Sequence, residues 1–83
     1  MKKYLVEVYL PAIGKRYDVF LPAGKKIGEA TQLLAGIAES LSAGSYKGTL
    51  DAVLLNADDG EPLARSDTVY DAGIRNASRL ILI

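Results

Sequence analysis

The 83-residue sequence contains no cysteine, no histidine and no tryptophan. Without cysteine there is no disulfide and no thiol nucleophile, and without histidine a frequent zinc ligand and general base is missing. The lack of cysteine is also compatible with a reducing compartment. These absences exclude most small-enzyme mechanisms, so we expect a protein that is not an enzyme, with no catalytic residue, no metal site and no cofactor.

Net charge and long apolar runs are absent as well. Ten Lys and Arg balance ten Asp and Glu, so no overall field attracts nucleic acid or an anionic membrane. No apolar run approaches the roughly 18 to 20 residues that span a bilayer. Glu7 interrupts the apolar segment that follows the basic N-terminal residues, and a signal peptide would have no charge there. We therefore expect a cytoplasmic protein that binds no nucleic acid and does not insert into a membrane.

The remaining composition is that of one folded domain. Hydrophobic residues make up 49% of the chain and charged residues 24%, a balance typical of globular proteins. The length suffices for one hydrophobic core and not for two. We predict a single domain over residues 1–83.

The first half of the chain predicts a hairpin followed by a helix. Apolar residues alternate over 4–10 and 17–21, around turn residues at 11–15, which indicates two antiparallel strands. Apolar residues then recur every three or four positions over 27–41, the pattern of one helix face. Gly36 costs roughly 1 kcal/mol relative to Ala inside this helix. Either a strand backbone approaches closely at Gly36, or the helix is simply weak there.

The second half predicts shorter elements. After a loop over 42–49, we expect a strand at 51–56, a turn at 57–60, and a short edge strand about 62–64, where Pro62 cannot donate to a ladder. Residues 66–73 predict one or two helical turns that end at a left-handed Gly73, and 79–83 form the last strand. The order predicts an α+β fold, a mixed sheet of four to five strands with one helix packed across it.

The C-terminal third resembles ubiquitin at residue level. Residues 68–74 read Thr-Val-Tyr-Asp-Ala-Gly-Ile, and Leu80 follows Ile74 by six residues. This block resembles the ubiquitin segment Thr-Leu-Ser-Asp-Tyr-Asn-Ile, which stands at the same spacing before the last strand of ubiquitin. Ala72 stands where ubiquitin has a tyrosine that locks this loop, so that lock is not carried over. The resemblance implies the ubiquitin-like β-grasp fold.

The same region is more similar to the YukD group of bacterial ubiquitin-like proteins, which are associated with type VII secretion loci. The positions shared with that group are Asp71, Gly73, Ile74, Asn76, Arg79 and Leu80. The resemblance implies a non-catalytic, non-conjugated interaction module that is an accessory component of a bacterial type VII secretion system, with a secretion component as its protein partner. For Asp71, Gly73 and Ile74, folding roles are sufficient: backbone capping, a positive φ, and a plug between helix and sheet.

The predicted sheet carries apolar residues on both faces. We expect the inward residues of the hairpin to face the helix, together with Val53, Leu55, Leu80 and Leu82. The opposite face of the sheet is then apolar as well. An antiparallel sheet usually has polar residues on that face. Several large apolar side chains on one face can form a binding surface, and the resemblance to ubiquitin implies docking through this face. The predicted contact residues are Leu5, Tyr9, Phe20, Leu54, Ile81 and Ile83. A homodimer contact or ordinary exposed side chains are the alternatives.

Other features favour ordinary roles or a different class of function. The carboxylates Asp58, Asp59 and Glu61 are better explained by turn formation than by acid-base or cation chemistry. Lys25 and Lys26 oppose the dipole at the start of the helix, which indicates a solvated or partner-facing pair. The alternative function is a ubiquitin-like modifier or sulfur carrier similar to ThiS and MoaD. It is disfavoured because such proteins need a C-terminal diglycine, where this sequence has a strand ending on Ile83.

Overall fold

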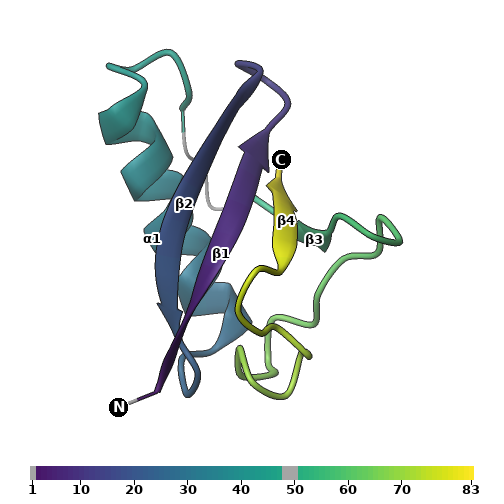
Figure 1. The fold of residues 1–83 in the computed structure, drawn as a ribbon. Coiled ribbons are helices and arrows are strands. Elements are labelled where there is room, and N and C mark those ends of the chain that lie inside the picture. The colour runs from purple at the N-terminus through teal and green to yellow at the C-terminus, as the bar shows by residue number, and fades with distance from the viewer. Residues whose placement is uncertain (1, 48–50) are drawn as a thin grey trace.

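The computed structural model describes residues 2–47 and 51–83, so the last two positions of the predicted loop 42–49 lie outside the described residues. Strands β1 (Lys3–Leu10) and β2 (Lys15–Pro22) form a hairpin, helix α1 (Ile27–Leu41) follows, and β3 (Leu54–Asn56) and β4 (Arg79–Leu82) complete the fold. The strand order is β2-β1-β4-β3, with β1 and β4 parallel and the other pairs antiparallel. Figure 1 shows α1 lying across one face of this sheet. The predicted mixed sheet with one helix is confirmed, with four strands among the described residues.

The core forms between α1 and the inward face of the sheet. Every second residue of β1 is inward and at most 3% exposed, which follows from the two-residue period of a strand. The helix buries most of its predicted apolar face, with Ala35 and Thr31 beside it, but Ile37 is only half-buried and Leu41 at its C-terminal end is 56% exposed. Thr31 tolerates burial because its hydroxyl donates to the Ile27 carbonyl at 2.7 Å. From β4 and the segment before it come Ile74, Leu80 and Leu82, all buried as predicted.

Three predictions for the second half of the chain are wrong in detail. The third strand begins at Leu54 rather than at residue 51. The expected strand about Pro62 is a single bridge to Leu55, because a proline without an N–H cannot extend a ladder. Residues 66–73 form hydrogen-bonded turns without a helix. Gly73 does have the predicted left-handed conformation, with φ of 86°.

Of the two alternatives for Gly36, the structure supports a helix that is simply weak at that position. A Cβ on Gly36 would meet nothing within 4 Å, so no strand approaches there and the glycine only weakens the helix. The close approach is instead at Gly28, where a Cβ would lie 3.3 Å from the Arg65 guanidinium. The first turn of α1, rather than its middle, is therefore the place where another segment comes near.

A different residue holds the turn that a tyrosine locks in ubiquitin. Arg75 Nη1 donates to the carbonyls of Tyr70 at 3.0 Å and Ile74 at 2.7 Å, and its guanidinium lies 4.0 Å from the centre of the Tyr70 ring. The oxygen that caps the turn belongs to Thr68, whose hydroxyl accepts from the Asp71 amide at 3.0 Å. Asp71 was expected to supply such a side-chain acceptor, and that prediction is wrong because Thr68 occupies the capping position.

Candidate functional site

The face of the sheet opposite α1, called the outer face here, contains the residues predicted to bind a partner. Leu5 and Tyr9 project from β1, Phe20 from β2, and Ile81 from β4, at the positions that alternate with the buried ones. Phe20 is 58% exposed and Leu5 42% exposed. Ile83 follows β4 on the same face and is 56% exposed. Five of the six predicted residues therefore lie on the outer face.

Leu54 is the exception, and its predicted orientation is wrong. It is 2% exposed and pairs across the ladder with Leu82, which is fully buried, so both side chains point into the core. Its neighbour Leu55 pairs with Ile81 and lies on the outer face in its place. Val53 exchanges two backbone hydrogen bonds with Ile83, at 2.9 and 3.0 Å, and also lies on the outer side. A one-residue shift in phase exchanges the two faces of a strand, and here it brings Val53 and Leu55 to the candidate site.

Strand register gathers these side chains into one group. Tyr9 is opposite Ile81, Ile81 is opposite Leu55, and the Val53–Ile83 pair comes next along β3 and β4. Opposite residues on one face have Cβ atoms about 5 Å apart. We call these five residues the apolar cluster: Tyr9, Val53, Leu55, Ile81 and Ile83. Leu55 and Ile81 are half-buried at its centre, while Val53 and Ile83 are exposed at its edge.

A row of charges separates this cluster from the other apolar side chains of the outer face. Glu7 is opposite Asp18 on β2 and opposite Arg79 on β4. The Arg79 guanidinium forms a salt bridge of 3.3 Å with Asp58 from the turn after β3. Beyond this charged row, Leu5 and Phe20 form a separate pair. The outer face is therefore divided: five apolar residues lie on one side of the row and two on the other.

Cations border the aromatic residues of the outer face. The Arg16 guanidinium lies 4.4 Å from the centre of the Tyr9 ring, and Lys3 Nζ lies 5.3 Å from that of Phe20. Such contacts are worth about 0.5 to 1 kcal/mol at exposed sites. They shield part of each ring from water, which reduces the cost of leaving aromatic residues on the surface.

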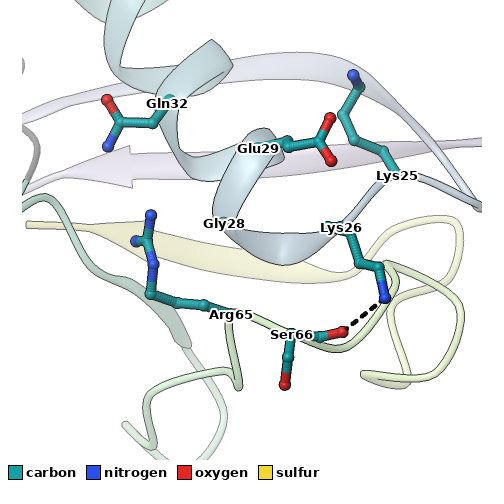
Figure 2. A pocket seen from close by; sticks show the side chains of 7 residues that line it. All are labelled: Lys25, Lys26, Gly28, Glu29, Gln32, Arg65 and Ser66. Carbon is teal, nitrogen blue, oxygen red and sulfur yellow. Dashed lines mark hydrogen bonds between the residues drawn. The ribbon is translucent and has the colours of Figure 1, made fainter.

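A second candidate site is the hollow beside the start of α1, shown in Figure 2. Lys25, Lys26 and Arg65 line it, which gives it a positive character. However, Lys26 Nζ donates to the Ser66 carbonyl at 3.0 Å, so Lys26 fastens the helix start to the neighbouring segment. Lys26 is exposed, as expected of a solvated lysine, but this bond also gives it a structural role that was not predicted.

Backbone bonds explain the same hollow as a structural junction. Lys26, at the N-cap, makes no side-chain capping bond. The amides of Ile27 and Gly28 donate instead to the carbonyls of Asp67 at 2.8 Å and Arg65 at 3.0 Å. These bonds satisfy donors that a helix start otherwise leaves free for an anion. The outer face is consequently the stronger candidate.

The turn carboxylates take structural roles, as predicted. Asp59 Oδ1 accepts from the Glu61 amide at 2.9 Å, and Asp58 pairs with Arg79. Among the described residues, no group of three or more acidic side chains is placed to hold a metal ion. Over the same ranges, no helix combines the length and apolar character needed to cross a membrane.

Solved structures similar to this chain include ubiquitin-like domains. The EccD5 ubiquitin-like domain from Mycobacterium xenopi superposes with a TM-score of 0.81 at 17% identity, covering 100% of this chain and 94% of that domain. The ubiquitin-like domain of the Mycobacterium tuberculosis type VII secretion protein EccD1 gives 0.66 at 18% identity, covering 100% and 99%.

A chain of the MycP5-free ESX-5 inner membrane complex also matches, with a TM-score of 0.81 at 19% identity. The match covers all of this chain, which spans about a fifth (21%) of the length of that larger chain. No protein-family model matches, and no curated protein matches. At identities below 20%, these superpositions show a shared fold alone, and the fold of this protein is the ubiquitin-like β-grasp.

Proposed function

We propose that this protein is a non-catalytic ubiquitin-like interaction module that binds a protein component of a bacterial type VII secretion system. The observation that carries the proposal is the apolar cluster, in which β1, β3, β4 and the residues flanking β3 and β4 place five apolar side chains on the face that α1 leaves uncovered. An apolar group bordered by charges is typical of a protein docking site, where apolar residues form the centre and polar residues the rim. The likeness to EccD domains supports the choice of partner class.

The charged row gives such a surface direction. A partner that covers the apolar cluster would meet Glu7, Asp18 and Arg79 at the edge of the contact. Charges at a rim influence association rate and partner choice more than final affinity. The centre of the contact would be Leu55 and Ile81, because they are opposite each other and surrounded by the other members of the cluster.

The test measures binding between the purified protein and the purified cytosolic domains of type VII secretion components encoded beside its gene. Leu55→Asp and Ile81→Asp should each weaken the interaction by about 2 kcal/mol, roughly thirtyfold, as expected for a central contact residue. Isothermal titration calorimetry provides the dissociation constants.

Phe20→Asp is the matched control, because it also replaces an exposed apolar residue of the outer face but lies across the charged row. It should change the affinity less than threefold, on the scale of rim substitutions. Circular dichroism establishes that each variant is folded. The proposal is wrong if no component binds, or if Leu55→Asp and Ile81→Asp bind as the unaltered protein does.

A further inference from the structure

Strand β2 leaves one long edge of the sheet open. It is eight residues long and pairs only with β1 in the strand order of the described residues. The opposite edge, β3, is short and is covered by the chain that follows it. The Asn56 amide donates to the Glu61 carbonyl, and the Leu63 amide donates to the Leu54 carbonyl, both at 3.0 Å. Open edges present unpaired backbone groups to other chains. The described sheet therefore has its available pairing edge on β2.

The hydrogen-bond pattern shows which β2 residues face that edge. The Ala23 amide donates to the Lys2 carbonyl at 2.9 Å, immediately beyond the hairpin register. In an antiparallel ladder, hydrogen-bonded and non-hydrogen-bonded pairs alternate, so the odd-numbered residues of β2 bond to β1. The N–H and C=O groups of Arg16, Asp18 and Phe20 consequently point outward. Pro22 has the same phase and no N–H to offer.

These outward residues allow only a few ways for two β2 strands to pair about a two-fold axis. Side chains on the same face must meet, and the axes that pair most of the strand pass through Tyr17, Asp18, Val19 or Phe20. An axis at Asp18 places two carboxylates opposite each other, which is destabilising. An axis at Val19 places Asp18 opposite Phe20, and Arg16 opposite Pro22, which cannot donate. An axis at Phe20 likewise places Asp18 opposite Pro22 and leaves Arg16 without a partner strand residue.

An axis at Tyr17 is complementary in charge. It places Arg16 of each copy opposite Asp18 of the other, as two cross-strand ion pairs on the outer face. Both are outward-pointing positions, so each pair would also exchange two backbone hydrogen bonds. The edge is thus complementary to itself in one register, and a pairing of this kind closes with no strand left open.

Apolar surface continues from this axis onto the helix. Tyr17 is half-buried and lines a shallow hollow with Ile13, Lys15 and Leu41. Leu41 is 56% exposed, and Leu33, two turns earlier on the same side of α1, is 43% exposed. Figure 1 shows α1 beside β2 at this edge of the molecule. A second copy paired at Tyr17 would bring a second such hollow to the axis.

We infer that the protein forms a homodimer by antiparallel pairing of its β2 edges, with Tyr17 on the two-fold axis and reciprocal Arg16–Asp18 pairs. In the isolated chain the Arg16 guanidinium stacks on Tyr9 at 4.4 Å, so it turns toward the neighbouring strand on pairing. The ion pairs therefore select the register, while backbone bonds and apolar contacts near Tyr17 hold the copies together. The inference is independent of the proposed function, because the apolar cluster stays uncovered.

The first test is a concentration series by sedimentation equilibrium on the full chain. The mass should rise from 8.9 kDa toward twice that value as concentration increases. Arg16→Glu and Asp18→Arg should each raise the dimer dissociation constant about tenfold or more, because each brings like charges together twice. The double variant restores opposite charges and should return the constant to within about threefold of the original.

The second test uses the absence of cysteine to report the register. Residues on the axis form a non-hydrogen-bonded pair with Cα atoms about 4.5 Å apart, within the range that a disulfide accepts. Tyr17→Cys should therefore form an intermolecular disulfide rapidly under mild oxidation. Val19→Cys is the matched control and should not, since in this register Val19 is opposite Lys15.

Four results would overturn the inference. The first is a monomeric mass at about 1 mM protein. The second is an unchanged dimer dissociation constant in the single charge variants, and the third is a double variant that dimerises no better than the single ones. The fourth is faster cross-linking of Val19→Cys than of Tyr17→Cys. If the monomeric chain accepts an extended peptide along β2, the edge binds other chains and does not pair with itself. Thermal unfolding of each variant separates loss of pairing from loss of folding.

Discussion

Leu54 and Leu55 are adjacent leucines whose removal should have very different consequences. Leu54 is 2% exposed in the core against Leu82, whereas Leu55 is half-buried on the outer face against Ile81. Leu54→Ala removes buried methyl groups and leaves a cavity, at a cost of about 3 kcal/mol within a typical range of 2 to 5. Leu55→Ala leaves no enclosed cavity, and we expect it to cost about 1 kcal/mol or less.

The cost of Leu54→Ala is a substantial fraction of the free energy of unfolding of the whole protein. A chain of 83 residues is stabilised by about 4 to 12 kcal/mol, so Leu54→Ala removes a quarter or more of the total. At about 4 to 8 °C per kcal/mol for a domain of this size, the midpoint should fall by roughly 12 to 24 °C. Leu55→Ala should lower it by less than about 8 °C.

Urea unfolding followed by circular dichroism measures both variants against the unaltered protein. The transition midpoint should shift strongly for Leu54→Ala, with an unchanged slope, since a core cavity alters stability and not the surface exposed on unfolding. If Leu55→Ala were the more damaging substitution, or if the two were equal, the assignment of these residues to opposite faces would be refuted. The proposed docking site would then lose its central residue.

Two further predictions concern α1 and the residues that follow it. Gly36→Ala should stabilise the protein by about 1 kcal/mol, because no atom of residues 2–47 or 51–83 lies within 4 Å of the new Cβ. Gly28→Ala should stabilise it less, because the Arg65 side chain must move. Thermal unfolding compares the two variants, and equal gains in stability would contradict the close approach at Gly28. Burial, with a smaller contribution from Glu39, raises the pKa of the Tyr46 hydroxyl above its usual value of 10.0. Its contribution to stability is therefore complete below pH 10 and declines as pH rises through and above that value, and Tyr46→Phe should show a shallower alkaline decline in urea titrations.

The hairpin and the helix could be predicted because apolar and polar residues alternate in them with a clear period. In β1 each buried residue alternates with a more exposed one, and the charges Lys3 and Glu7 fix the phase. In α1 the apolar residues recur every three or four positions, a spacing that fits a helix and not a strand. Five of the six predicted contact residues lie on the outer face because one charge in each of these strands, Glu7 in β1, Asp18 in β2 and Arg79 in β4, fixes the phase.

The phase of β3 could not be predicted in this way. Val53, Leu54 and Leu55 are consecutive apolar residues, so no alternation distinguishes the two faces. The pairing of Leu54 with Leu82 decides the orientation, and that pairing joins residues 28 positions apart. The charged row was also missed, because Glu7, Asp18 and Arg79 become neighbours only through the register of three strands.

The sequence by itself determined the order of elements, the inward residues of the hairpin, the buried face of the helix and the left-handed turn at Gly73, because each depends on neighbours along the chain. The tertiary structure alone decided which leucine of β3 faces outward, how the outer face is divided, and which strand edge is open. These features depend on contacts between distant segments. Local periodicity does not specify such contacts when both faces of a strand are apolar.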